Sequence, residues 1–296
     1  RLFMTTSHPL RSVLYMPGSN ARALEKAQNL AADCLIFDLE DAVSPDAKEV
    51  ARKQVCEAAA SGLYGQRHIV IRCNGLDTPW GADDIAAIAK SGASAVLVPK
   101  VESAGMVKSV ETLMKDAGAP ADQTIWCMME TPMGMLHAEE IASASDRLSC
   151  FVMGTSDLVK DMHAQHTAMR LPVLTGLSLS ILAARAYGLR VLDGVYLDLA
   201  DEEGFAASCQ QGLELGFDGK TLIHPKQLAA ANDAFGLSAD DVAYAEKVIA
   251  AFKAAEEDGK FVVLVDGKLV EVLHVEIARR QVEMANAIAA LEADMA

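Results

Sequence analysis

Two carboxylate residues in the middle of the chain stand where apolar segments end. Glu130 directly follows Ile125–Met129, and Asp157 comes shortly after Cys150–Met153. Carboxylate oxygens suit Mg²⁺, which takes few protein ligands and keeps water or substrate oxygens in its shell. If the two segments are neighbouring parallel strands, both side chains can reach one point, so we predict that Glu130 and Asp157 bind magnesium. Asp157 could instead cap the helix that follows it.

A second group of charged residues follows two earlier apolar segments. Glu40 and Asp41 lie in the run Asp-Leu-Glu-Asp, where they could bind the waters of a metal ion, although Asp41 could also cap a helix. Arg72 ends the apolar run Ile-Val-Ile-Arg, and a buried arginine is costly without an anionic partner. Its planar guanidinium suits a substrate carboxylate or a developing enolate oxygen. The alternative is a structural ion pair with Glu40 or Asp38.

These residues belong to a repeating pattern of short apolar segments, each followed by a helix-length amphipathic stretch. Eight strands that alternate with helices indicate parallel pairing through βαβ crossovers. The predicted strands are Ser12–Met16, Cys34–Asp38, His68–Arg72, Ala95–Val98, Ile125–Met129, Cys150–Met153, Leu192–Leu197 and Gly219–Ile223. The predicted helices between them include Asn20–Ala31, Asp46–Ala60, Ala82–Ser91, Ala104–Ala117, Val173–Gly188 and Glu202–Gly216.

Two architectures fit such a pattern, and the positions of the polar residues separate them. A dinucleotide-binding fold would carry G-x-G-x-x-G after an early strand, but the first strand is followed by Pro17-Gly18-Ser19-Asn20, which predicts a turn and a helix N-cap. A closed barrel places active residues just past the carboxyl ends of several strands. Polar clusters follow six of the eight predicted strands. We therefore predict a (β/α)8 TIM barrel with its site at that face.

The end of the chain predicts an extension after the barrel. We expect the barrel to cover residues 1–236 and a helical extension with a lid to cover residues 237–296. Helices are predicted at Ala229–Phe235 and Ala239–Glu257, with a hinge at Asp258-Gly259 and a final helix at Val275–Glu292. Between them lies an apolar hairpin, residues 260–271, which turns at Asp266-Gly267. Such a hairpin should cover a barrel mouth, its own or that of a neighbouring subunit.

Composition excludes several classes of partner. A net charge of −15 argues against nucleic acid, which requires a basic surface. The six cysteines contain no C-x-x-C pair and fit reduced thiols in the cytoplasm better than disulfides. No apolar run approaches the roughly 20 residues needed to cross a bilayer, and the first residues lack the apolar core of a secretory signal. We therefore expect a cytoplasmic protein without a membrane partner.

Several motifs carry a resemblance that spans nearly the whole chain. They are RSVLYMPGSNARALEKA, IFDLEDAV, VIRCNG, VLVPKVES, METPMGML, VMGTSDL, DGVY and GFDGKTLIHPKQ. In this order they resemble the citrate lyase beta-subunit-like (HpcH/HpaI aldolase/citrate lyase) family. That family includes malyl-CoA, methylmalyl-CoA and citramalyl-CoA lyases, and a branch that hydrolyses (3S)-malyl-CoA. The resemblance implies a barrel, a Mg²⁺ ion on Glu130 and Asp157, and an Arg72 that holds the reacting oxygens.

The same resemblance implies how coenzyme A and other subunits are bound. A CoA thioester would lie across the mouth, and homotrimers or dimers of trimers would place each lid over a neighbour's site. The implied contacts to CoA or substrate, besides Arg72 and Glu130, are Pro17, Gly18, Ser19, Arg22, Lys26, Ile223, His224 and Pro225. From the sequence alone, His224 is as compatible with a turn or a cap as with catalysis.

One departure from the lyases of this family lies in the predicted lid. Their motif, similar to Val265–Glu271 here, ends in an Asp that acts as the acid/base, whereas this chain has Glu271. The extra methylene moves the carboxylate by about 1 Å, which matters for proton transfer. Glu in this position, with Leu-His shortly after, resembles the hydrolytic branch. We therefore expect hydrolysis of (3S)-malyl-CoA to malate and CoA, with Glu271 activating water or attacking the thioester.

Three other readings stay open at this point. The first is carbon–carbon cleavage of malyl-CoA, β-methylmalyl-CoA or citramalyl-CoA, giving acetyl-CoA or propionyl-CoA and glyoxylate or pyruvate, on the same site. The second is a class II pyruvate aldolase, a family that uses a His near the second strand, where this chain has Asp-Leu-Glu-Asp. The third is a non-catalytic subunit that serves an acyl carrier protein, which would not need the apolar lid.

Overall fold

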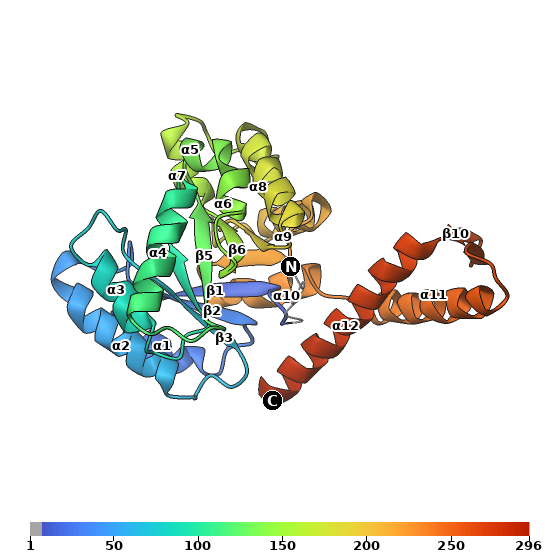
Figure 1. Cartoon of the computed structure of the whole chain (residues 1–296), viewed down its shortest axis with the longest axis horizontal. Coiled ribbons are helices and arrows are strands. Elements are labelled where there is room, and N and C mark those ends of the chain that lie inside the picture. The colour runs from blue at the N-terminus through green and yellow to red at the C-terminus, as the bar shows by residue number, and fades with distance from the viewer. Residues whose placement is uncertain (1–7, 296) are drawn as a thin grey trace. The chain divides into compact units, whose positions relative to one another are not determined.

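Eight parallel strands form a closed barrel in the computed structural model, which describes residues 8–295 (Figure 1). The barrel closes because β1 pairs with β2 on one side and with β8 on the other. Its strands are β1 (Ser12–Pro17), β2 (Cys34–Asp38), β3 (His68–Arg72), β4 (Ala95–Val98), β5 (Thr124–Met129), β6 (Leu148–Met153), β7 (Arg190–Asp193) and β8 (Gly219–Leu222). The predicted (β/α)8 barrel is confirmed.

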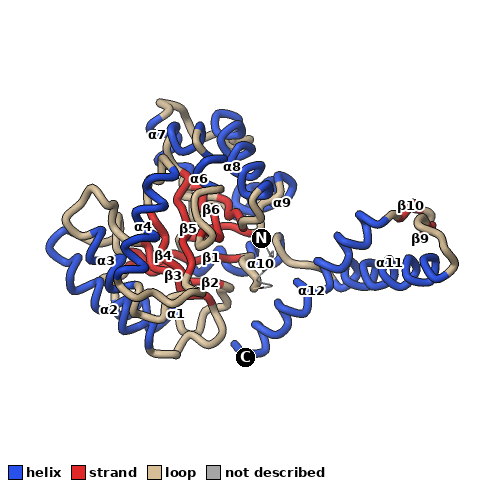
Figure 2. The backbone as a smooth tube through the Cα atoms, in the orientation of Figure 1, coloured by secondary structure: helices blue, strands red, loops and turns tan. Residues whose placement is uncertain are grey.

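Helices connect successive strands and cover the outside of the barrel, as the blue segments around the red strands show in Figure 2. Three 3₁₀ turns lie among them: η1 (Pro45–Ala47), η2 (Leu171–Val173) and η3 (Pro225–Gln227). The helices of this part are α1 (Ala21–Ala27), α2 (Lys48–Ala60), α3 (Gly81–Ile88), α4 (Ala104–Asp116), α5 (Pro132–Leu136), α6 (Ala138–Ala142), α7 (Thr155–Asp161), α8 (Leu174–Ala186), α9 (Glu202–Leu215) and α10 (Leu228–Ala234).

Both faces of the sheet are apolar, and each belongs to a separate cluster. Successive side chains of a strand point to opposite faces, so one set fills the barrel and the other packs under the helices. The inner cluster includes Val13 of β1, Ile36 of β2 and Trp126 of β5, and β5 lies opposite β1 in the closed barrel. The outer cluster includes Leu14 and Phe37, which contact the helix layer. This burial on both faces explains the near-continuous apolar strands.

The seventh strand differs from its prediction. We expected it at Leu192–Leu197, but β7 covers Arg190–Asp193 and the following residues form a loop. The ring of Tyr196 in this loop contacts Phe205 of α9, with 5.9 Å between ring centroids, whereas Leu197 and Leu199 are exposed. The hydroxyl of Tyr196 donates a hydrogen bond to Asp201 at 2.5 Å. Apolar composition alone could not distinguish these contacts from those of a strand.

The chain divides into two compact units, with a division between Phe235 and Gly236. The unit after the barrel contains α11 (Ala239–Glu257), the antiparallel hairpin of β9 (Val263–Val265) and β10 (Lys268–Val270), and α12 (Val272–Met295). The predicted hairpin turn is present, with positive φ at both Asp266 and Gly267.

The last helix begins earlier than we predicted, at Val272 rather than Val275. The backbone carbonyl of Glu271 accepts hydrogen bonds from the amides of His274 and Val275, so the first helical turn starts there.

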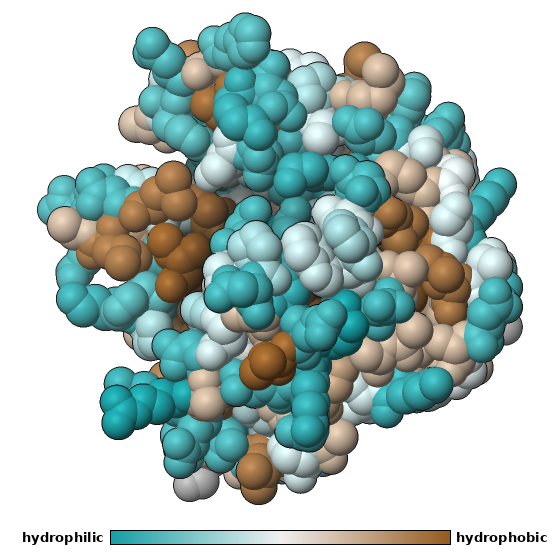
Figure 3. Space-filling model, turned by 90° about the vertical axis from the view of Figure 1, so that its left-hand side faces the viewer, coloured by the Kyte–Doolittle hydropathy of each residue, from teal (hydrophilic) through white to brown (hydrophobic). Residues whose placement is uncertain are grey.

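Within residues 8–295, no helix combines the length and apolarity that a bilayer span requires. The face displayed in Figure 3 is mostly hydrophilic, with apolar residues in separate patches.

A buried ion network anchors the end of β7 beneath the helices. Asp193 is fully buried, and its carboxylate accepts hydrogen bonds from Lys220 Nζ at 2.9 Å and from Arg170 Nη1 at 2.6 and 2.8 Å. Arg170 also donates to Gln211 of α9 at 2.6 Å. A buried carboxylate is tolerated only when such partners compensate for its lost hydration. The network therefore joins β7, β8, α9 and the loop before η2.

We predict that Lys220→Met lowers the free energy of unfolding by about 3 kcal/mol, because it leaves part of the charge of Asp193 uncompensated in the core. Urea denaturation followed by circular dichroism measures this change. Lys226→Met is the matched control, since Lys226 is exposed and its removal should change stability by less than about 0.5 kcal/mol. Equal stability of the two variants would contradict the structural role of the network.

Candidate functional site

An ion pair between the last residues of β2 and β3 forms the base of the site. Asp38 and Arg72 are direct partners in the register of these strands, and both are buried. The guanidinium donates from Nε to Asp38 Oδ1 at 2.7 Å and from Nη2 to Oδ2 at 2.6 Å. This bidentate pairing fixes the plane of the guanidinium. Asp38, which the sequence offered only as a structural alternative, is therefore Arg72's main partner.

Glu40 lies against the remaining nitrogen of Arg72. Its Oε2 is 2.9 Å from Arg72 Nη1, whereas the exposed Asp41 is 3.6 Å from the same nitrogen. The amide of Glu40 donates to Asp38 Oδ1 at 2.9 Å, so the same carboxylate that holds Arg72 also shapes this loop. Burial raises the pKa of Glu40, although Arg72 opposes the change. Arg72 thus presents Nη1 on the side of the loop after β2.

Glu130 is a buried carboxylate at the end of β5. One of its oxygens accepts a hydrogen bond from the backbone amide of Lys100 at 2.8 Å. Lys100 adopts a left-handed φ of 49°, which is unusual for a residue with a side chain, and its ammonium contacts Glu40 at 3.1 Å. Burial raises the pKa of Glu130 to about 7. In the described part of the chain, no cationic side chain forms an ion pair with this carboxylate.

The loop after β6 approaches Glu130 closely because Gly154 has no side chain. A Cβ at this position would lie 2.4 Å from both Cβ and Oε2 of Glu130. Asp157 follows in the first turn of α7, near enough to influence the pKa values of both Glu130 and Lys100. Gly154, not Asp157, holds the N-cap position, so the capping alternative for Asp157 is wrong. The carboxylate of Asp157 instead accepts a hydrogen bond from Lys160 at 2.9 Å.

These carboxylates suit a hard divalent cation. Glu130 is desolvated without an ammonium or guanidinium partner, and a bound cation would supply the missing positive charge. Among residues 8–295, no group of three or more His, Cys, Asp or Glu is arranged to hold a metal. A cation between Glu130 and Asp157 would therefore complete its shell with water or substrate oxygens, as Mg²⁺ commonly does.

A tyrosine that the sequence analysis missed lies inside the barrel at this end. Tyr15 packs against the inner cluster and its ring faces Arg72, with the guanidinium carbon 5.2 Å from the ring centroid. Its hydroxyl is 3.3 Å from Sδ of Met128, two residues before Glu130. The inward alternation along β1 could have identified Tyr15. Lys100 and Gly154 belong to two of the quoted motifs, but the sequence does not show what they do. Lys100 acts through its backbone amide, and Gly154 acts by leaving space for Glu130.

The predicted CoA contacts come from two adjacent loops, because β1 and β8 are neighbours. Pro17 pairs with Asp38 at the end of β1, and Gly18 packs so closely that a Cβ would lie 2.5 Å from the carbonyl oxygen of Asp38. Ser19 is exposed, as are Arg22 and Lys26, which lie one turn apart on α1. Asn20 caps α1 as predicted, accepting from the amide of Ala23.

The loop after β8 begins with the exposed residue Ile223. Nδ1 of His224 accepts a hydrogen bond from the amide of Lys226 at 3.1 Å, and Pro225 opens η3. His224 therefore has a capping role in the structure. Because this loop lies beside β1, a contact between His224 and the ligand stays a prediction.

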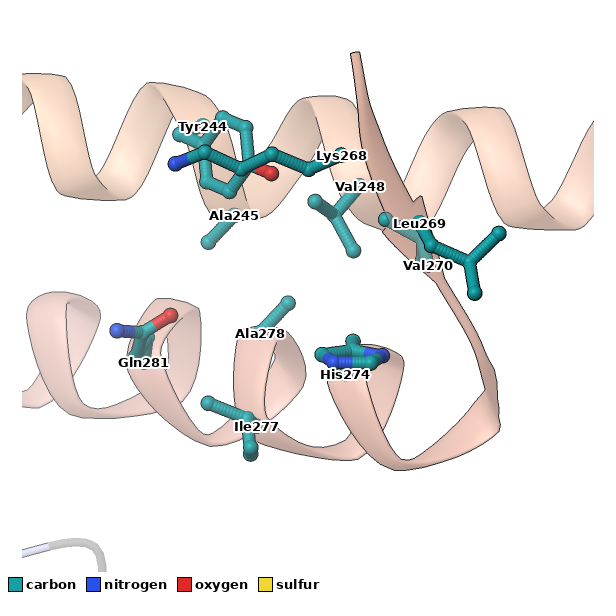
Figure 4. A pocket seen from close by; sticks show the side chains of 10 residues that line it. All are labelled: Tyr244, Ala245, Val248, Lys268, Leu269, Val270, His274, Ile277, Ala278 and Gln281. Atoms are coloured by element: carbon teal, nitrogen blue, oxygen red, sulfur yellow. The ribbon is translucent and has the colours of Figure 1, made fainter. Parts of the chain in front are cut away.

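Glu271 lies in the C-terminal unit, between β10 and α12. Its carboxylate is exposed and pairs with no side chain in the described part of the chain. The amide of Glu271 donates to Nδ1 of His274 at 3.0 Å, so His274 helps to cap α12. Figure 4 shows His274 at one end of a cavity of about 420 Å³ within this unit, with Gln281 further along the same helix and with Tyr244 and Lys268 on the opposite side. The geometry leaves Glu271 accessible.

Comparisons with known proteins agree with the motifs. The chain is 51% identical over 287 residues to a (3S)-malyl-CoA thioesterase of Cereibacter sphaeroides, covering 97% of this chain and 98% of the relative. It is 37% identical to a citrate lyase subunit beta of Leuconostoc mesenteroides, with coverages of 94% and 93%. A solved structure of CitE from Mycobacterium tuberculosis, in complex with magnesium, acetoacetate and coenzyme A, matches with a TM-score of 0.75 and 28% identity over 93% of this chain and 97% of that chain.

A family model, HpcH/HpaI aldolase/citrate lyase, matches residues 11–225, which are nearly the whole barrel. Together with the relatives above, this match settles the resemblance that the motifs predicted: the chain belongs to the HpcH/HpaI aldolase/citrate lyase family.

Proposed function

We propose that this protein is a magnesium-dependent thioesterase that hydrolyses (3S)-malyl-CoA to malate and CoA. The observation that carries the proposal is the 51% identity, over nearly the full length of both chains, to a thioesterase with this substrate in its name. The barrel mouth supports it with a fixed arginine and two carboxylates suited to a cation. Glu271, the residue that separates the hydrolytic pattern from the lyase pattern, is accessible.

The alternative is cleavage of the carbon–carbon bond by the same site. Citrate lyase beta subunits are 34–37% identical to this chain over most of its length, which favours a shared ancestral chemistry. Both reactions place negative charge on an oxygen of the acyl group, and Arg72 with a cation would stabilise either one. They differ in what the base acts on: a water molecule in hydrolysis, a carbon-bound or hydroxyl proton in cleavage.

The proposed metal ligands are Glu130 and Asp157, with Glu40 and Asp41 holding water molecules around the ion. When bound, Mg²⁺ would polarise substrate oxygens as a Lewis acid and orient the acyl group. Lys100 keeps Glu130 in place through its backbone amide, and Gly154 leaves the space that this carboxylate occupies. The solved structure of CitE from Mycobacterium tuberculosis contains magnesium together with acetoacetate and coenzyme A, which supports this assignment.

In the proposed hydrolysis, Arg72 holds the acyl group and Glu271 accepts a proton from the attacking water. Arg72 would bind an acyl oxygen through Nη1, which contacts Glu40 in the structure, because Asp38 holds Nε and Nη2. Glu271 of a neighbouring copy accepts a proton from water while the water oxygen bonds to the thioester carbonyl carbon. The carbon–sulfur bond then breaks, and the CoA sulfur leaves with the bonding pair and is protonated. The carboxylate of Glu271 could also attack directly, which would give an anhydride that water opens.

Coenzyme A is proposed to lie along the neighbouring loops after β1 and β8. Pro17, Gly18 and Ser19 would contact it from the first loop, and Ile223, His224 and Pro225 would contact it from the second. Arg22 and Lys26 offer two exposed positive charges one helical turn apart on α1, a spacing suited to the phosphates of the nucleotide part. The remaining surface keeps its acidic character.

The function is tested by incubating the purified protein with (3S)-malyl-CoA and Mg²⁺ in the presence of a glyoxylate trap. We predict malate and free CoA in equal amounts and no trapped glyoxylate from the unmodified protein. Glu271→Ala should reduce turnover by roughly 10²–10⁴, the range expected for loss of a general base. Glu271→Asp should slow hydrolysis and reveal carbon–carbon cleavage, because the shorter side chain matches the lyase pattern.

Glu276→Ala provides the matched control, since Glu276 is also an exposed acid in the first turns of α12. It should keep full activity, and both alanine variants should bind magnesium like the unmodified protein. Glyoxylate formed as fast as the thioester disappears would identify a lyase instead. A loss below threefold in Glu271→Ala would make Glu271 a residue of the lid alone, with His274 or a water on the metal as the next candidate.

We predict that magnesium binding weakens about tenfold from pH 8 to pH 6. The pKa of Glu130 is raised to about 7 in the metal-free protein, so this carboxylate becomes protonated as the pH falls through 7, and the proton competes with the ion. Isothermal titration calorimetry with Mg²⁺ alone measures the affinity at each pH. Glu130→Gln should bind weakly at both values. An affinity that is independent of pH would exclude Glu130 as a ligand.

We also propose a homotrimer, or a dimer of trimers, in the cytoplasm. The C-terminal unit exposes large apolar residues, which a free surface rarely gathers in one segment. They are Phe261, Val262, Leu264, Leu269, Val272, Leu273 and Ile277. All six cysteines are free thiols, five of them buried, which fits a reducing compartment.

Analytical ultracentrifugation should show a trimer or hexamer, and the double variant Leu264→Glu, Leu269→Glu should dissociate it, because both charges would be buried in the contact. Activity should fall with dissociation if Glu271 serves a neighbouring site. An active, monodisperse monomer of the unmodified chain would contradict both the assembly and this role.

A further inference from the structure

Tyr15 spans the inside of the barrel just below the charged residues. It projects inward from β1, and its hydroxyl reaches Met128 of β5, 113 positions away and on the opposite wall. The side chain remains partly exposed, unlike the fully buried Val13 one step further inside on the same strand. Tyr15 therefore separates the apolar interior from the mouth and forms part of the floor of the site.

The hydroxyl of Tyr15 lies near charged residues but makes only a weak hydrogen bond. It contacts the thioether sulfur of Met128 at 3.3 Å, and a thioether is only a weak hydrogen-bond acceptor. Burial raises the pKa of Tyr15 well above its ordinary value, even though Arg72 opposes the change. The phenol therefore keeps its proton at neutral pH and acts as a donor. A donor at the floor of an acyl site can turn to a better acceptor when one arrives.

The ring of Tyr15 also fixes where that acceptor would lie. Arg72 stands over the ring at 5.2 Å, and Asp38 locks the guanidinium plane. Met128, the present partner of the hydroxyl, precedes Glu130 on the same inward-facing side of β5. The ring is thus beside the guanidinium, and the phenol oxygen contacts Met128, one layer below the buried carboxylate. An acyl oxygen held at the mouth by Arg72 would approach this hydroxyl from above.

We propose that Tyr15 is a substrate-binding residue, whose hydroxyl exchanges Met128 for a carboxylate or carbonyl oxygen of the acyl group held by Arg72. This inference rests on the proposed function, because it assumes an acyl group with anionic oxygens at this mouth. It assigns to Tyr15 a neutral hydrogen bond that complements the charges of Arg72 and the cation. No proton is transferred by Tyr15, since the phenol remains protonated throughout.

The test removes only the hydroxyl. Tyr15→Phe keeps the ring under Arg72, and its affinity for (S)-malate in the presence of Mg²⁺ is compared with that of the unmodified protein by calorimetry. We expect malate binding to weaken about tenfold to a hundredfold, the effect of losing a hydrogen bond to a charged group. The kcat/KM for (3S)-malyl-CoA should fall by a similar factor. Affinity for Mg²⁺ alone should stay within twofold, because the phenol contacts neither proposed ligand.

Tyr64→Phe is the matched control. The hydroxyl of Tyr64 donates to the carbonyl oxygen of Leu24 at 3.0 Å in the helix layer, so its loss should lower the melting temperature without changing malate affinity. Malate binding by Tyr15→Phe within twofold of the unmodified protein overturns the inference, as does an unmodified protein that binds no malate. Malate binding that depends on Tyr15 in a protein that does not hydrolyse malyl-CoA supports the inference and overturns the proposed function alone.

Discussion

The buried ion pair of Asp38 and Arg72 is the interaction on which the site depends. Two charges are tolerated inside the barrel because strand register brings them together and their hydrogen bonds satisfy each other. Asp38 also accepts the amides of Glu40 and Ala42, so the loop after β2 takes its shape from the same carboxylate. Glu40 then contacts Lys100, whose amide positions Glu130. The register of β2 and β3 thus determines a series of contacts that runs from Asp38 through Glu40 and Lys100 to Glu130.

In this arrangement the negative charge of Glu130 is not compensated by a cationic side chain of the described residues. Arg72 is committed to Asp38 and Glu40, and the ammonium of Lys100 contacts Glu40, so Glu130 receives only a backbone hydrogen bond. The raised pKa of this carboxylate follows from that shortage of positive charge together with burial. A divalent cation would relieve the shortage and draw in substrate oxygens at the same time. The proposed cofactor would therefore supply the positive charge that this carboxylate lacks in the folded chain.

The sequence predicted the barrel and its charged residues because their signals are local. Apolar segments buried on both faces and polar residues at strand ends follow directly from the (β/α)8 plan. The seventh strand was misplaced because Val195, Tyr196 and Leu197 continue the apolar run although they lie in a loop, where Tyr196 packs on Phe205 and Leu197 is exposed. Tyr15, Lys100 and Gly154 were missed as site residues because their roles depend on distance and backbone conformation. The structure is needed to see that the ring of Tyr15 faces Arg72, that Lys100 has a left-handed φ, and that Gly154 lies against Glu130.

The barrel residues alone do not determine which bond breaks. Arg72, a cation on Glu130 and Asp157, and the phenol of Tyr15 would all stabilise charge on acyl oxygens, and both hydrolysis and carbon–carbon cleavage develop such charge. The choice depends on where a base withdraws its proton. In this chain the candidate base, Glu271, is exposed and belongs to a compact unit other than the barrel. In the proposed mechanism, a change from Asp to Glu there would redirect the reaction without altering the packing of the barrel core. Members of one family can therefore keep the same barrel and differ in the reaction that they catalyse.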